Sequence, residues 1–111
     1  TYGVLPSHDH KDWQFGGEQV LEHQKDEPGR MILKGGRGHA ELLQTLGDFV
    51  LQVSFTTLAP NVNSGVFLRC IPGDSMNGYE CQIQSGYKQD RRLPIDAGTG
   101  AIFRRQSARC V

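Results

Sequence analysis

The sequence predicts an all-β fold, an antiparallel β-sandwich formed by one domain over residues 1–111. Several short segments alternate apolar and polar residues with a period of two, as half-buried strands do. Turns containing glycine or asparagine separate these segments at regular spacing, and no strand–helix–strand alternation occurs. Glycine makes up 14 of the 111 residues, almost twice its usual share of about 7%, which indicates many tight turns.

Composition excludes two classes of partner. Twelve basic residues balance twelve acidic ones and the pI is about 6.8, so no overall charge attracts nucleic acid or an anionic membrane. No apolar run approaches the roughly 18 residues of a membrane-spanning segment. The oligomeric state stays open.

The first half of the chain gives the weaker element predictions. Residues 1–30 are polar and interrupted by turn-forming residues, and a short apolar segment follows at residues 31–33. Residues 40–46 are predicted as strand, although the leucine spacing also fits a short helix. Residues 49–55 (FVLQVSF) show the clearest alternation and are predicted as a half-buried strand.

The second half contains three further candidate strands, at residues 66–70, 79–84 and 101–105, of which the last is the weakest. The turn-rich residues 71–78 lie between the first two, so these two are expected to form an antiparallel hairpin. Because their apolar faces must coincide, one register that fits sets Leu68 opposite Ile83, and Cys70 opposite Cys81.

In that register the other face of the hairpin gathers chemically useful side chains. Arg69 and Glu80 are diagonal neighbours there, within reach of long side chains. The face carries the best constellation of the chain: Phe67, Arg69, Glu80, Gln82 and Gln84.

Two segments together resemble the 3-keto-disaccharide hydrolase domain family. They are residues 63–69 (NSGVFLR) and residues 77–83 (NGYECQI), with residues 47–51 and 98–103 matching in the same order. The resemblance covers roughly residues 13–109 and implies a jelly roll of the concanavalin or laminin-G type. It also implies a carbohydrate partner, cleavage of glycosides whose sugar is oxidised at C3, and export to the periplasm or surface of a bacterial cell.

Family members continue through several strands beyond the point where this sequence ends. The resemblance therefore implies that residues 1–111 are the N-terminal portion of a longer domain, since a sandwich without those strands would leave long edges and an uncovered sheet face.

The chemistry of a 3-keto-glycoside suggests roles for the hairpin residues. The ketone acidifies the proton on C2, so a site needs a base near that proton and a cation near the oxygen that becomes anionic. Glu80 is the candidate base or a metal ligand, and Arg69 is the candidate cation. Gln82 and Asn63 offer amides to sugar hydroxyls, and Ser64 completes the candidate substrate-binding set. No cofactor is certain, and a divalent metal ion stays open.

Other interpretations stand beside this one. Arg69 and Glu80 also fit an ordinary exposed ion pair, and the scaffold also fits a non-catalytic carbohydrate-binding module. A conventional glycosidase fits less well, because it needs two facing carboxylates and the hairpin face supplies only Glu80. Residues 8–10 (HDH) fit a solvated segment better than a metal site. Cys70 and Cys81 fit either a disulfide or, more readily, two buried thiols.

Overall fold

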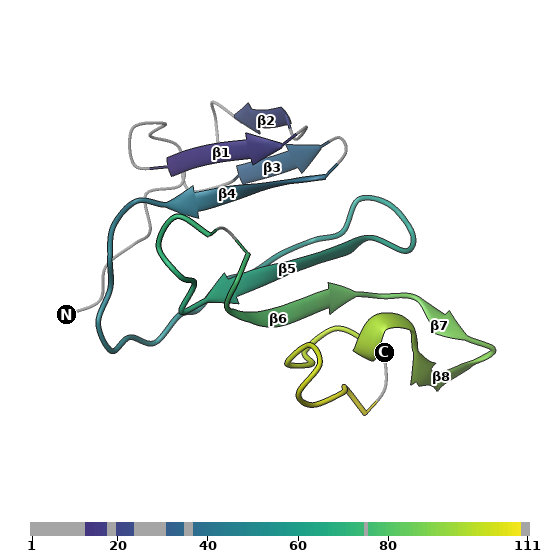
Figure 1. Cartoon of the computed structure of the whole chain (residues 1–111). Coiled ribbons are helices and arrows are strands. Elements are labelled where there is room, and N and C mark those ends of the chain that lie inside the picture. Colours follow the sequence, from purple (N-terminus) through teal and green to yellow (C-terminus); the bar gives the residue numbers. More distant parts are fainter. Residues whose placement is uncertain (1–12, 18–19, 24–30, 35–36, 75, 110–111) are drawn as a thin grey trace. The chain divides into compact units, whose positions relative to one another are not determined.

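The computed structural model of the chain describes residues 13–17, 20–23, 31–34, 37–74 and 76–109. It divides into two compact units, residues 1–50 and residues 51–111 (Figure 1). Both are built from antiparallel strand pairs, and no α-helix occurs in the described ranges. The predicted all-β class is confirmed, whereas the jelly-roll topology and the single domain stay predictions.

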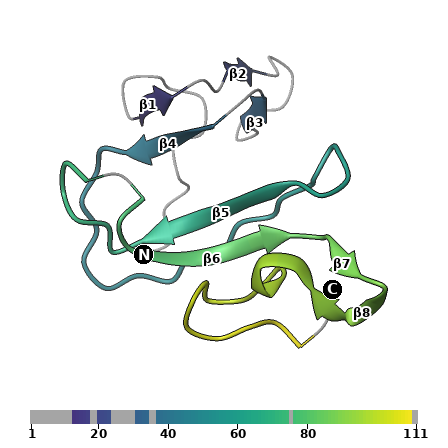
Figure 2. The same ribbon diagram turned by 45° about the vertical axis from the view of Figure 1, so that its right-hand side comes forward.

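The first unit consists of two strand pairs, one nested inside the other along the chain (Figure 2). Strand β1 (Trp13–Gly17) pairs with β4 (Gly38–Leu42), and β2 (Val20–His23) pairs with β3 (Met31–Lys34). The apolar segment at residues 31–33 is thus part of β3. The strand predicted at residues 40–46 is present as β4, which ends at Leu42.

The prediction of a strand at residues 49–55 is wrong. These residues belong to no ladder of the structure, and Val50 is 97% exposed while Phe55 is 52% exposed. Alternation of apolar residues determines which side chains share a face, but a strand also needs a neighbouring backbone to accept its hydrogen bonds. None of the described segments pairs with this one.

The second unit is centred on the hairpin of β5 (Asn63–Leu68) and β6 (Tyr79–Gln84), which confirms the predicted antiparallel pair. Its connection contains a type II turn at residues 71–74, where the Asp74 N–H donates to the Ile71 carbonyl over 3.0 Å. Pro72 and Gly73 occupy the central positions, and Gly73 has φ +78°, as this turn type requires.

The predicted register of the hairpin is wrong by four residues. Val66 lies opposite Cys81, and Leu68 lies opposite Tyr79. Strand β5 ends at Leu68 because Arg69 has φ +56°, outside the extended region, so the connection is longer than the predicted one. A slip of an even number leaves every side chain on its predicted face.

The edge of β6 away from β5 is paired by residues 99–103. The Gly100 N–H donates to the Gln82 carbonyl, and the Gln82 N–H donates to the Ala101 carbonyl, both over 2.9 Å. Two residues therefore face one, which is a β-bulge with glycine in the left-handed conformation (φ +86°) as its first residue. Strand β6 is thus the central strand of this unit.

The prediction of a strand at residues 101–105 is also wrong. After the bulge only Ile102 makes isolated bridges, to Cys81 and to Gln106. The chain then turns at Arg104, whose φ is +58°. The Arg105 and Gln106 N–H groups both donate to the Ile102 carbonyl, over 2.9 and 2.8 Å, so this segment is a tight turn docked on β6.

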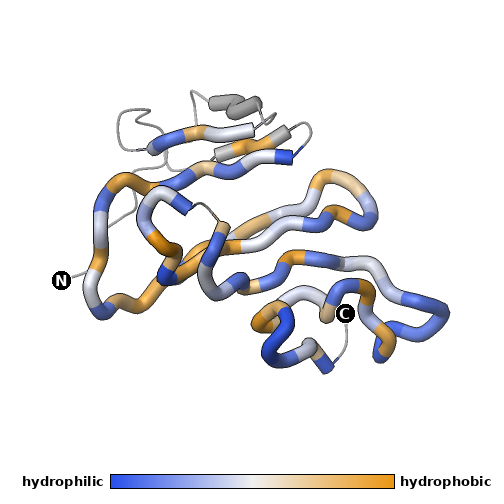
Figure 3. Tube along the Cα trace, in the orientation of Figure 1, coloured by the Kyte–Doolittle hydropathy of each residue, from blue (hydrophilic) through white to orange (hydrophobic). Residues whose placement is uncertain are grey.

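A small hairpin and a single 3-10 turn complete the second unit. Strand β7 (Tyr87–Lys88) pairs with β8 (Asp90–Pro94), and η2 (Ile95–Ala97) follows directly. Figure 3 shows the tip of this hairpin as hydrophilic. There the Arg92 guanidinium binds the Asp90 carboxylate at 2.7 Å, in a solvent-exposed ion pair of small energetic value.

Two of the three buried side chains of the described residues are polar, and the third, Ala101, is 1% exposed. Gln82 is 2% exposed and Gln84 is 4% exposed, and Ala101 is the one buried apolar residue of these ranges. The face of β6 that carries the glutamines is therefore interior at that end, whereas the sequence predicted a non-core face. Residues 95–101 cover it through hydrogen bonds to β6.

Candidate functional site

Glu80 lies near the start of β6, on the same face as Gln82. Its side chain is half-buried. On one side it is paired with Phe67 of β5. On the other side its backbone carbonyl accepts a hydrogen bond from the Phe103 N–H over 2.9 Å. A carboxylate on a central strand, with an aromatic residue at each neighbouring position, is thus held by backbone pairing on both sides.

Gly65 makes room for the Glu80 side chain. A Cβ atom built on Gly65 would lie 2.6 Å from Oε1 and 2.7 Å from Cγ of Glu80, far inside ordinary van der Waals contact. The carboxylate therefore lies across the bare backbone of Gly65, diagonally over β5. Sequence reasoning did not select Gly65 as a site residue, although it stands inside the NSGVFLR segment.

Burial and one positive charge act on Glu80 in opposite directions. Desolvation raises the pKa of the Glu80 carboxyl above its ordinary value, and the charge of Arg104 lowers it by a smaller amount. The Arg104 guanidinium carbon lies 5.3 Å from the centre of the Phe103 ring, within cation–π range. A carboxylate with a raised pKa is a better proton acceptor at neutral pH than an ordinary glutamate.

The predicted site residues do not all lie on the face of the hairpin that carries Glu80. Asn63 shares the face of Glu80 and is exposed, whereas Ser64 lies opposite Ile83 on the other face. Arg69 follows the end of β5 and is exposed. The cation whose charge lowers the Glu80 pKa is Arg104. Sequence reasoning missed Arg104 because residues 101–105 were predicted as a strand.

The side-chain amide of Gln82 is buried and forms a hydrogen bond within the second unit. Its Nε2 donates to the backbone carbonyl of Asp96 over 2.9 Å, which ties η2 to β6. Its Oε1 is buried and has no hydrogen-bond partner among the described residues. Buried polar atoms normally have partners, so Gln82 retains one acceptor site while its donor supports the fold.

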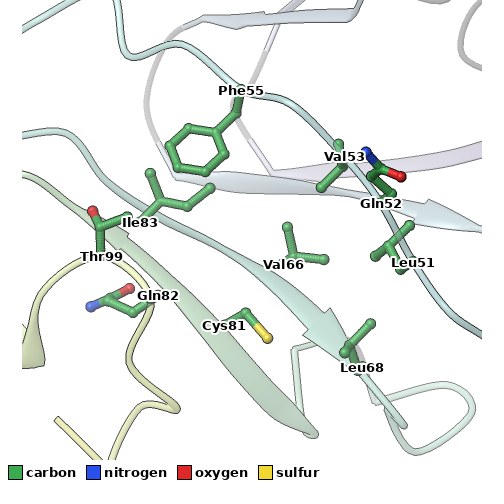
Figure 4. A pocket seen from close by; sticks show the side chains of 11 residues that line it. Leu51, Gln52, Val53, Phe55, Val66, Leu68, Cys81, Gln82, Ile83 and Thr99 are labelled. Carbon is green, nitrogen blue, oxygen red and sulfur yellow. The ribbon is translucent and has the colours of Figure 1, made fainter. Parts of the chain in front are cut away.

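The opposite face of the hairpin borders an apolar hollow of about 390 Å³ (Figure 4). Val66 and Ile83 of the hairpin and Leu51 and Phe55 of the preceding segment lie around it. Carbon dominates this lining, so the hollow lacks the paired acid, base or cation that bond cleavage needs. Of the two faces of the hairpin, the one that carries Glu80 presents a carboxylate.

Metal ligands and a disulfide receive no support from the described ranges. No three His, Cys, Asp or Glu side chains converge there as a metal site. The candidate metal motif at residues 8–10 lies outside the described residues. Cys70 and Cys81 are half-buried and not joined in a disulfide, in keeping with a register that sets Val66 opposite Cys81.

Comparison with known proteins identifies the family. The family model described as 3-keto-alpha-glucoside-1,2-lyase-like domain matches residues 4–109. No curated protein and no solved structure matches the chain. None of the helices in the described residues is long and apolar enough to span a membrane. The family match agrees with the resemblance carried by the NSGVFLR and NGYECQI segments, and the chain belongs to the family of 3-keto-alpha-glucoside-1,2-lyase-like domains.

Proposed function

We propose that the chain cleaves glycosides whose sugar carries a ketone at C3, with Glu80 as the general base. The observation that supports this most is the Glu80 side chain, which is half-buried and lies across Gly65 on the central strand. Desolvation raises its pKa, so the carboxylate holds a proton more tightly than an ordinary glutamate does. The family description names the same class of reaction.

The proposed reaction begins at C2 of the sugar. Glu80 takes the C2 proton, which the neighbouring C3 ketone has acidified, and the electron pair is held as an enediolate at C3. This pair then forms the C1–C2 double bond, while the bond from C1 to the glycosidic oxygen breaks and the leaving group takes up a proton. Addition of water places a hydroxyl on C1 and a proton on C2, so the net change is hydrolysis.

Several polar groups near the hairpin are proposed to bind the sugar. Asn63 presents an exposed amide on the Glu80 face. The predicted role of Gln82 as a sugar ligand is not part of this proposal, because its side chain is 2% exposed. Ser64 offers a hydroxyl at the same end of β5, but from the other face of the strand. Arg69 stands beyond the opposite end of β5 and supplies an exposed guanidinium. Amides and hydroxyls can both donate to and accept from sugar hydroxyls.

The direct test is a product assay with a 3-keto-glucoside and with its unoxidised parent glucoside. Wild-type protein should release the aglycone from the keto form alone. Glu80→Gln should abolish release while its circular dichroism stays unchanged. Asp74→Asn, which changes an exposed carboxylate of the hairpin connection, is the control and should keep full activity. Unchanged turnover by Glu80→Gln would remove Glu80 from the mechanism.

A carbohydrate-binding module is the second candidate function. Phe67 and Phe103 lie on either side of Glu80, and aromatic rings are common stacking surfaces for apolar faces of ligands. Calorimetry with keto and ordinary sugars separates the two functions. Heat of binding without any product would favour the module, and product release favours the enzyme.

We further propose that the protein is exported to the periplasm or cell surface. The support is the family membership of a domain whose description names a sugar-acting enzyme. Fractionation of cells that express the complete gene is the test, because an exported protein leaves the cytosolic fraction. Recovery in the cytosol alone would contradict this part of the proposal.

A further inference from the structure

The turn at residues 102–106 is fastened to β6 beside Glu80. The Ile102 N–H donates to the Gln106 carbonyl over 2.9 Å, and the Gln106 N–H donates back over 2.8 Å. These two bonds close the turn. The Phe103 N–H then donates to the Glu80 carbonyl over 2.9 Å. The residue that follows Phe103 is therefore the direct neighbour of a residue whose backbone is hydrogen-bonded to Glu80.

That following residue is Arg104, and its guanidinium contacts the ring of Phe103. Its carbon lies 5.3 Å from the centre of the Phe103 ring, within the range of a cation–π contact. Arg105, the next residue, has an exposed side chain as well, but its charge is not among those that act on Glu80. Of these two adjacent arginines, Arg104 is the one whose guanidinium lies over the ring of Phe103, the residue bonded to Glu80.

The charge of Arg104 acts on the Glu80 carboxyl, although within the described residues the two side chains form no ion pair. A base already joined to a cation would be a poor proton acceptor. Two opposite charges that share one site at a longer distance can instead act on neighbouring atoms of a ligand.

Building on the function proposed above, we propose that Arg104, rather than Arg69, is the cation of this site. Its guanidinium binds the C3 oxygen, which becomes anionic as Glu80 removes the C2 proton. The C2 proton and the C3 oxygen belong to adjacent carbons of the substrate, so Glu80 and Arg104 must approach the same side of the sugar. The backbone hydrogen bond from the Phe103 N–H to the Glu80 carbonyl sets Phe103 beside Glu80, and the Arg104 guanidinium lies over the Phe103 ring. A guanidinium aimed at the developing charge stabilises the enediolate more than the ketone.

The test compares single arginine variants in the 3-keto-glucoside assay. Removal of one donor to a developing oxyanion typically lowers kcat by about 10²–10³-fold, and Arg104→Gln should show a loss of this size. Arg105→Gln changes the neighbouring exposed arginine and should stay within a few-fold of wild type. A large loss for Arg69→Gln together with full activity of Arg104→Gln would overturn the assignment.

A second measurement tests the role of Arg104 without relying on the proposed reaction. Carbon-13 NMR of the Glu80 carboxyl follows its titration without any substrate. Arg104→Gln should raise the Glu80 pKa, because a positive charge that lowers it is lost, and Arg105→Gln should leave it unchanged. Equal titration in all three proteins would overturn the role of Arg104. A rise confined to Arg104→Gln supports Arg104 as the cation at Glu80 even if wild-type protein cleaves no 3-keto-glycoside, a result that would reject only the proposed function.

Discussion

Gly65→Ala is the substitution that most sharply tests the geometry around Glu80. The added methyl group would lie 2.6 Å from Glu80 Oε1 and 2.7 Å from its Cγ. Ordinary contact begins at 3.4 Å, so the carboxylate must retreat by about 0.8 Å. The atoms in the way belong to a flexible side chain, so the backbone of β5 and β6 can stay in place.

The expected effects on stability and on activity differ widely. Crowding of this kind costs about 1–3 kcal/mol, and a flexible side chain places the cost near the lower end. Replacement of glycine in a strand interior returns roughly 0.5–1 kcal/mol. The free energy of unfolding should therefore stay within about 1 kcal/mol of wild type. A displacement near 1 Å at the reacting group lowers catalysis by about 10²-fold.

Two measurements on the same preparation check this separation. Urea denaturation gives the free energy of unfolding, and aglycone release from the 3-keto-glucoside gives kcat/KM. Gly47→Ala is the control, since nothing lies within 4 Å of a Cβ at that position, and it should change neither value appreciably. Full activity of Gly65→Ala at native-like stability would refute the argument that the position of the Glu80 carboxylate over Gly65 matters for the reaction.

Three further predictions concern the supports of the site. Gly100→Ala should lower the free energy of unfolding by about 1–2 kcal/mol, because alanine is strained at φ +86°; a melting curve identical to wild type would reject the bulge. Gln82→Ala should cost about 2 kcal/mol through the cavity and the lost bond to Asp96, whereas Gln82→Leu should recover most of it because leucine fills that cavity, both variants having lost the buried acceptor without a partner; equal losses would contradict this. Because the Glu80 pKa is raised above 4.5, the folded chain holds its proton to higher pH than the unfolded chain. This contribution to stability should fall as the pH rises above about 4.5, and denaturation at several pH values should show a smaller decrease for Glu80→Gln than for wild type.

The faces of the central hairpin could be predicted from the sequence, but its register could not. Alternation in residues 66–70 and 79–84 determines which side chains share a face, and any even slip preserves that result. The register goes with the conformation of the connection, in which Arg69 has a positive φ and β5 ends at Leu68. No sequence pattern requires a non-glycine residue to adopt this conformation.

Two predicted strands failed for a related reason. Residues 49–55 alternate and residues 101–105 are largely apolar, but pairing depends on which other backbone lies beside them. The turn that replaces the second of these strands is what places Arg104 near Glu80. The candidate base could thus be identified from the sequence, whereas its cationic neighbour requires the three-dimensional arrangement.

Exchange of the hydrogen at C2 tests the central role of Glu80 most directly. A 3-keto-glucoside deuterated at C2 is incubated with enzyme in ordinary water, and mass spectrometry follows the label in the unreacted substrate and in the products. Wild-type protein should wash the label out, and folded Glu80→Gln should leave it in place. Loss of deuterium at the wild-type rate from Glu80→Gln would show that another group removes the proton.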